Sequence, residues 1–206
     1  MTAVKNRGRF WLVMLVLLLC LVGLFFLSFL IGTYPIGPAA VWDIIRSRFM
    51  AVAVYWEDVM AQIVLQVRLP RILLGILVGG ALSISGASYQ TLFKNPMVSP
   101  DLLGVSAGAG FGAALVMLLG GSWWQIQSSA FLFGVAAVAA AWCIGRIFGG
   151  QNITVLVLAG VVVSSFFQAL LSIIKTLADP DDALPSITFW LMGSLGKAAM
   201  DDVLVM

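Results

Sequence analysis

The stretch that decides the fold runs from Phe10 to Gly32 and reads FWLVMLVLLLCLVGLFFLSFLIG. It is 23 residues long and holds no charged side chain. A helix that crosses a bilayer needs about 20 apolar residues, whereas the apolar core of a signal peptide has roughly 7–15. The basic residues before the stretch would also suit a signal peptide, but no small-residue cleavage site closes it. We therefore predict a retained transmembrane helix.

The composition extends this interpretation to the whole chain. Of its 206 residues, 62% are hydrophobic and 10% are charged, against roughly 25% charged in a typical soluble domain. A net charge of +2 does not predict a nucleic-acid partner. The sequence has no histidine, the commonest general base and metal ligand, and we predict neither catalytic residues nor metal ligands. Cys20 and Cys143 lie in apolar runs and are interpreted as packing residues.

Four more stretches are long and apolar enough to cross a membrane. They are Ile72–Phe93, Leu102–Gly120, Ser129–Phe148 and Ile153–Ile174. A sixth begins near Val203, and we expect it to continue past residue 206 in a longer protein. The predicted fold class is an all-α membrane protein, a polytopic helical bundle forming a single domain over residues 1–206.

The orientation follows from the basic residues that flank the spans. Lys5, Arg7 and Arg9 precede the first span, which predicts a cytoplasmic N-terminus. The loops then carry five basic residues inside and six outside, so only the shorter length of the inside loops supports this topology. Outside segment 33–71 includes Val41–Phe49, where apolar residues recur at helical spacing and predict an interfacial amphipathic helix. A second short outside helix is expected from Pro185 to Leu195.

Small residues recur four apart in the predicted spans. Helices associate in lipid where such residues let their backbones approach closely, so these positions predict packing seams, which do not identify a function. They are Gly75, Gly79 and Ser83 in the second span and Gly108 and Gly112 in the third.

Polar residues gather in the fifth span. Ser164, Gln168 and Ser172 fall four apart, with Ser165 beside them. A polar side chain in lipid is costly unless it is hydrogen-bonded or wetted. The row therefore predicts either an interhelical hydrogen bond or one wall of a polar translocation path.

The connection between the second and third spans has an ordered pattern. Residues 86–109 read GASYQTLFKNPMVSPDLLGVSAGA. Pro96 and Pro100 end one helix and permit the next to begin, and Asn95 suits a turn. With Gln90 and Gly104, these residues form the motif that we place in a cytoplasmic turn.

This segment resembles the membrane-subunit family of iron-siderophore, haem and vitamin B12 ABC importers. The resemblance also rests on three shorter stretches: RLPR at 68–71, LAGV at 158–161 and FWLMGS at 189–194. It covers the chain from about Arg68 to its end and identifies that part as the N-terminal portion of a permease subunit.

The resemblance implies an architecture and partners. Such a subunit has ten helices in the bacterial inner membrane and pairs with a second permease subunit, in a homodimer or a heterodimer. The dimer binds two cytoplasmic ATPases, which hold ATP and Mg, and one extracytoplasmic substrate-binding protein. The permease itself carries no cofactor. Ferric siderophore is the default cargo, with haem and cobalamin open.

Arg68 and Arg71 lie at the predicted outer mouth of the second span. They are interpreted either as basic side chains that snorkel toward headgroups or, from the resemblance, as residues that meet acidic residues on the docking binding protein. An arginine can grip a carboxylate with two hydrogen bonds and stays charged. We expect both side chains at the water boundary.

Two other classes of function remain as alternatives. A membrane-embedded enzyme would need ionisable groups converging within the bilayer, and no nucleophile–base pair is recognisable. The residues from Gly193 to Lys197 lack the spacing of a phosphate-binding loop, so we expect no ATPase site in this chain. A structural or assembly subunit without transport is the other alternative.

Overall fold

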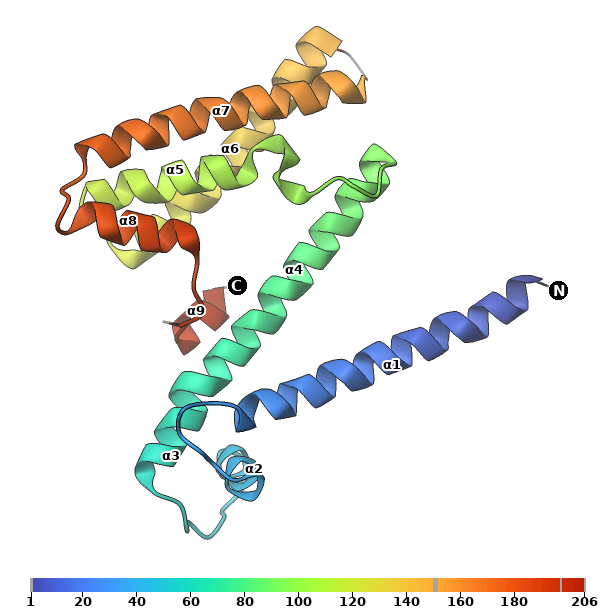
Figure 1. Ribbon diagram of the computed structural model, residues 1–206, viewed down its shortest axis with the longest axis vertical. Helices are drawn as coiled ribbons and strands as arrows, with labels where there is room; N and C mark the ends of the chain where they lie inside the picture. The colour runs from blue at the N-terminus through green and yellow to red at the C-terminus, as the bar shows by residue number, and fades with distance from the viewer. Residues whose placement is uncertain (1, 150–151, 197, 206) are drawn as a thin grey trace. The chain divides into compact units, whose positions relative to one another are not determined.

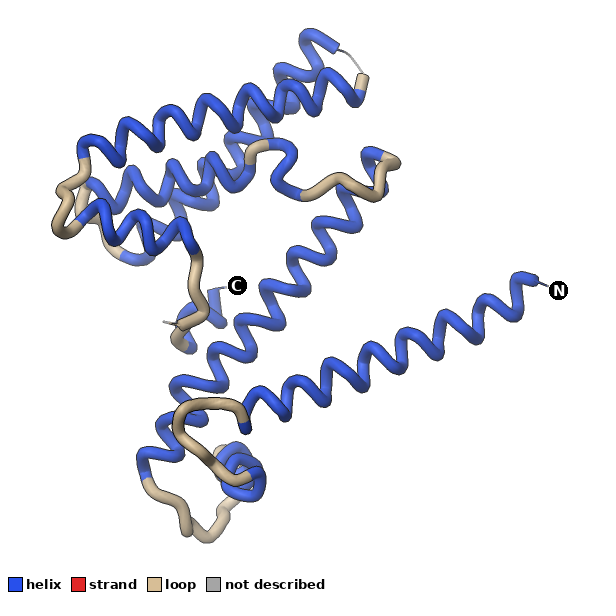
Figure 2. The backbone as a smooth tube through the Cα atoms, viewed as in Figure 1, coloured by secondary structure: helices blue, strands red, loops and turns tan. Residues whose placement is uncertain are grey.

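The computed structural model describes residues 2–149, 152–196 and 198–205, and within these ranges it has helices and no strand (Figure 2). This confirms the predicted all-α class. The chain divides into two compact units. One takes in the chain up to Gly79 and from Leu195 onward, and the other spans Gly80–Ser194. The side chains of Lys5 and Arg7, and Lys197 altogether, lie outside the described residues, so the orientation stays a prediction.

The first unit begins with the helix α1, Thr2–Leu30 (Figure 1). Three short elements follow, α2 (Pro38–Arg46), α3 (Asp58–Gln62) and the π-helical η1 (Ile63–Arg68). They lead into α4, Leu69–Phe93, whose first residues belong to this unit. The helix α9, Met200–Val205, includes Val203, near which the sixth span was expected to begin, and that span stays a prediction.

The predicted amphipathic helix is present as α2, but its apolar side is not left to the membrane surface. Val41 and Ile44 are buried with Phe29 of α1 and Val64 of η1. Phe49, which we had placed on the same helix, lies beyond its end and is 84% exposed. The predicted bounds are therefore corrected, and the buried side of the helix joins α1 to η1, while the interfacial location stays a prediction.

The second span starts earlier than predicted. Helical backbone runs without a break from Asp58 to Phe93, 36 residues in all, whereas the sequence placed the start at Ile72. Proline lacks an amide hydrogen and clashes with the carbonyl of the preceding turn. The wider π-helical turn of η1 directly precedes Pro70 and accommodates that ring within a continuous helix. At about 54 Å, the run is longer than the ~30 Å hydrocarbon core.

The second unit holds the remainder of α4 and four further helices. These are α5 (Val105–Leu118), α6 (Trp123–Gly149), α7 (Ile153–Leu177) and α8 (Ala183–Met192), with the short 3-10 helix η2 (Pro100–Leu103) ahead of α5. Helices α5, α6 and α7 lie side by side (Figure 1). Their core is formed by small and aromatic side chains, among them Ala137, Ala141 and Phe167.

The third predicted span, 102–120, differs from the helix observed. Its first residues form η2, and α5 begins only at Val105, because Gly104 adopts a left-handed backbone with φ of 82°. The resulting 14-residue helix is about 21 Å long. Four helices of the described chain are long and apolar enough to cross a membrane, namely Gly8–Leu30, Asp58–Phe93, Trp123–Gly149 and Ile153–Leu177. The five crossings therefore stay a prediction in which α5 is the short member.

The small residues fall into two groups. A Cβ at Gly108 would lie 2.5 Å from the Phe133 carbonyl oxygen, and one at Gly112 would lie 2.6 Å from that of Ser129. The Ser129 hydroxyl also donates to the Gly112 carbonyl at 2.8 Å. On α4, a Cβ at Gly75 would meet only a Leu195 methyl, one at Gly79 would meet no atom within 4 Å, and Ser83 is exposed. Among the predicted small residues, close backbone approach is thus found on α5 and not on α4.

We predict that Gly108→Ala and Gly112→Ala each destabilise the protein by about 1–3 kcal/mol, because the added methyl group meets backbone that cannot turn aside. The control is Gly79→Ala, which fills open space and gains helix propensity. Apparent melting temperatures in detergent measure the difference. Equal melting temperatures for all three variants would contradict the assignment of α5–α6 as a backbone-contact seam.

Candidate functional site

Arg68 lies inside the first unit. Its side chain is only 8% exposed. The guanidinium donates from Nη1 to the carbonyl oxygen of Phe29 and from Nη2 to that of Tyr34, the latter at 2.5 Å. A Cβ on Gly32 would lie 2.6 Å from Nη2, so glycine leaves the space that the guanidinium fills. The expectation that Arg68 sits at the water boundary is wrong.

The chemistry of this contact is that of a helix terminus. Phe29 is in the last turn of α1, where carbonyl oxygens have no partner within the helix and carry partial negative charge. A guanidinium satisfies such oxygens with several donors in a fixed plane, and it remains charged when buried. Arg68 therefore fastens the end of α1 and the following turn to η1.

Arg71 has a different environment. It is exposed and donates from Nη2 to the carbonyl oxygen of Gly196, within the same unit. Pro70 between the two arginines is fully buried. One turn of helix thus separates an arginine that holds the fold together from one that faces solvent, and only Arg71 keeps the accessibility that docking requires.

Two tyrosines that the sequence analysis did not single out order the loop around α2. The Tyr34 hydroxyl donates to Glu57 at 3.2 Å, and the Tyr55 hydroxyl donates to Asp43 at 2.9 Å. Each carboxylate accepts a hydrogen bond from the protonated phenol, which favours that form and so raises the pKa of the tyrosine that donates to it. Tyr34 also supplies one of the two carbonyl oxygens that Arg68 binds, so this loop is joined to the contact between Arg68 and the end of α1.

The turn motif of the second unit is stabilised by hydrogen bonds between its own residues. The Gln90 amide donates to the Pro96 carbonyl at 3.0 Å, and the Asn95 carboxamide oxygen accepts from the Met97 amide at 2.9 Å. Pro100 opens η2, whose C-cap is Gly104. Gln90 reaches this turn from the last turn of α4, and the other four motif residues lie between Asn95 and Gly104; the cytoplasmic location stays a prediction.

The same turn contacts α7. A Cβ at Gly104 would lie 2.9 Å from the Ser164 hydroxyl oxygen and 3.3 Å from its amide nitrogen. The Leu102 carbonyl lies against Gly160, which belongs to the stretch 158–161. Two motifs that were separate in the sequence therefore meet, and Ser164 is half-buried at their contact.

The other polar residues of α7 form an exposed row. Ser165 donates to the Val161 carbonyl and Ser172 to the Gln168 carbonyl, both at 2.9 Å. Thr176, not singled out from the sequence, continues the row and donates to Ser172. These hydroxyls are satisfied by their own helix. The Gln168 side chain is exposed and makes no hydrogen bond to any other described residue, so its amide is available to a ligand or to water.

Residues 17–206 match the FecCD transport family. The molybdate import permease MolB of Haemophilus influenzae is 34% identical over 84% of this chain and 51% of its own length. The vitamin B12 import permease BtuC of Salmonella paratyphi A is 36% identical over 93% of this chain and 54% of its own. A solved structure, described as a metal-chelate type ABC transporter in an inward-facing conformation, aligns with a TM-score of 0.76 and 33% identity over 93% of this chain and 56% of that one. The chain thus spans about half the length of its relatives.

We predict that Arg68→Ala lowers the stability of the protein by about 1–3 kcal/mol, because the Phe29 carbonyl at the end of α1 and the Tyr34 carbonyl in the next turn lose their partner. Arg68→Lys should restore only part of the loss, since an ammonium lacks the planar fork. Arg71→Ala, which removes an exposed arginine, should leave the melting temperature nearly unchanged.

Gly32→Ala supplies an independent check because its methyl group would displace the guanidinium without removing it. It should destabilise the parent protein but have little further effect on the Arg68→Ala variant, as contacting residues do in a double-mutant cycle. Gly23→Ala, at an open position of α1, is the matched control. Additive losses from Gly32→Ala and Arg68→Ala would show that the two residues do not act through one contact.

Proposed function

Because the chain belongs to the FecCD transport family, we propose that it is the N-terminal part of the permease subunit of a bacterial ABC importer. The match over residues 17–206 carries the proposal, and it confirms the family resemblance seen in the sequence. Long apolar helices support a location in the inner membrane. The subunit carries no ATPase site of its own in this proposal and takes its energy from partner ATPases that bind ATP and Mg in the cytoplasm.

The proposed topology has five complete crossings and a cytoplasmic N-terminus. It places the turn 94–104 in the cytoplasm and places α2, α8 and the start of the long second helix outside. The length of the run from Asp58 to Phe93 supports this arrangement, because its first turns can extend beyond the hydrocarbon core toward an external partner.

The translocation path in this proposal runs along the polar row of α7. Ser165, Gln168 and Ser172 are exposed on one side of that helix, and the side chain most able to meet a passing solute is Gln168. The serine hydroxyls bond back to their own helix, so they make that side polar without needing a partner. Ser164, half-buried against Gly104, positions the helix instead of facing the path.

The proposed cargo is a ferric siderophore. A structural neighbour described as a metal-chelate type transporter supports a metal complex as cargo. MolB is named for molybdate, a small oxyanion, so uptake of molybdate is the competing proposal. A comparison of both solutes in one uptake assay separates the two.

Arg71 is proposed as the residue of this chain that docks the substrate-binding protein. It is exposed, permanently charged and located at the start of α4, on the outside in the proposed topology. Arg68 is left out of this role because its donors are engaged by Phe29 and Tyr34.

We predict that Arg71→Glu in the full-length permease weakens binding of the substrate-binding protein about tenfold and flattens its dependence on salt, because rim charges set association rate and salt sensitivity. Arg48→Glu, at another exposed arginine of the predicted outside segment, is the control. Surface plasmon resonance across a salt series measures both quantities. Failure of the parent permease to bind any such protein would contradict the proposed function, while unchanged binding by Arg71→Glu would contradict only the docking role.

A further inference from the structure

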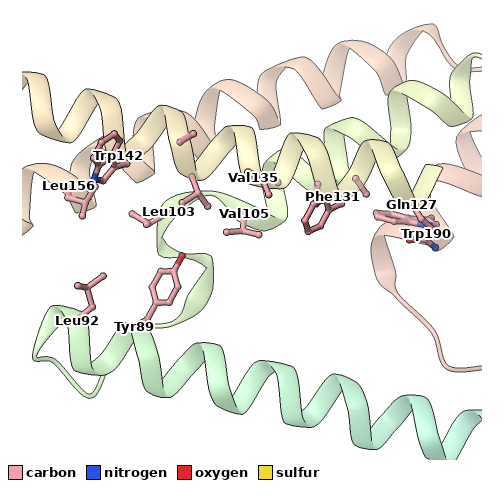
Figure 3. A pocket seen from close by; sticks show the side chains of 15 residues that line it. Tyr89, Leu92, Leu103, Val105, Gln127, Phe131, Val135, Trp142, Leu156 and Trp190 are labelled. Atoms are coloured by element: carbon pink, nitrogen blue, oxygen red, sulfur yellow. The ribbon is translucent and has the colours of Figure 1, made fainter. Parts of the chain in front are cut away.

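The segment that follows α8 leaves the second unit and lies on the start of α4. Trp190, in the last turn of α8, lines an apolar pocket of the second unit (Figure 3). Gly193 ends that helix with φ of 70°, a backbone conformation that glycine adopts most readily. Leu195 and Gly196 then belong to the first unit, where both contact the first turns of α4.

Two contacts hold this segment, and they lie one helical turn apart. The Arg71 guanidinium donates from Nη2 to the carbonyl oxygen of Gly196. A methyl group of Leu195 lies 3.6 Å from the place that a Cβ on Gly75 would take, which is ordinary van der Waals contact. Arg71 and Gly75 are four residues apart and share one side of α4. Because Leu195 and Gly196 are consecutive, the seat of Leu195 on Gly75 sets where the Gly196 carbonyl lies.

The Gly196 carbonyl restrains an arginine that is otherwise exposed. A free arginine side chain samples many rotamers and loses that freedom when it binds a partner. A carbonyl oxygen is neutral, so it orients the guanidinium without neutralising its charge. One such bond also leaves other donors of the guanidinium for a carboxylate. Part of the ordering that docking requires is therefore already present in the free protein.

We propose that Leu195 and Gly196 are positioning residues that pre-organise Arg71 for a carboxylate of the substrate-binding protein. The proposal rests on the docking role that is proposed above for Arg71. The stretch 189–194, which carries part of the family resemblance, leads directly into these two residues. A contact that serves folding alone would change stability and leave the binding of a partner as it is.

The test measures binding of the substrate-binding protein to the full-length permease by surface plasmon resonance across a salt series. Leu195→Ala, and Gly75→Ile, whose side chain competes for the place of Leu195, should each weaken binding about fivefold. Neither variant changes a charge, so the salt dependence should stay parental, whereas Arg71→Glu flattens it. Gly75→Ala, whose methyl group fits, and Leu77→Ala, at another exposed leucine of the first unit, should bind like the parent.

The Arg71→Ala background shows whether the segment acts through the arginine. In that background Leu195→Ala should cause no further loss of binding, as expected for residues that act through one contact. An equal loss from Leu195→Ala with and without Arg71 would overturn the proposal. Parental binding by both Leu195→Ala and Gly75→Ile would also overturn it.

A second measurement needs no binding protein. The Ala198 amide donates to the Leu195 carbonyl at 3.2 Å, so its hydrogen exchange reports whether the segment is held. Arg71→Ala should speed that exchange severalfold, while Arg48→Ala, the matched control, should leave it parental. Unchanged exchange in Arg71→Ala would contradict the contact itself. Faster exchange in Arg71→Ala, together with a parent permease that binds no such protein, would contradict the docking function and leave a contact that serves folding alone.

Discussion

Contact between helix backbones is the interaction on which the second unit depends. Lipid is as apolar as leucine side chains, so helices gain little in a membrane from burying apolar surface against each other. They gain from dispersion contacts, which fall off steeply with distance and therefore require small residues at the seam. Gly108 and Gly112 bring α5 onto the backbone of α6, and Gly160 brings α7 onto the turn at Leu102. The polar row of α7 is positioned by these contacts.

The first unit is held together by a buried arginine that binds backbone carbonyl oxygens. Its helices meet mainly at their ends, where carbonyl oxygens without partners are costly in an apolar setting. Arg68 satisfies one such oxygen at Phe29 and a second carbonyl at Tyr34 in the following turn, and it joins the end of α1 to η1 beside the small core around Phe29 and Ile44. Arg71, three residues later, is left in solvent. Two arginines of one four-residue motif therefore have different surroundings, one buried within the fold and one exposed.

The sequence predicted most of the helices because apolar length is a direct requirement of the bilayer, as α6 and α7 illustrate. It missed the start of the second helix because residues 58–68 mix polar and apolar side chains and precede Pro70, which normally marks a boundary. It misplaced the start of α5 because the apolar pair Leu102 and Leu103 continues the hydrophobic run, while the left-handed backbone of Gly104 interrupts the helix. The burial of Arg68 depends on long-range contacts with Phe29 and Tyr34, which no local pattern encodes. The turn motif was placed together correctly because prolines and Asn95 act within a few residues of each other.

We propose that this chain is part of a permease that moves a metal chelate inward at the expense of ATP hydrolysed by a partner. The most direct measurement is uptake of a radiolabelled ferric siderophore into vesicles that contain the full-length permease, its ATPase and its binding protein, with molybdate measured in parallel. The account predicts ATP-dependent accumulation of the ferric siderophore and no comparable accumulation of molybdate. Accumulation of molybdate alone would contradict the proposed cargo. Haem and cobalamin are tested in the same vesicles. If none of the four solutes accumulates while the ATPase is active, the transport function is contradicted.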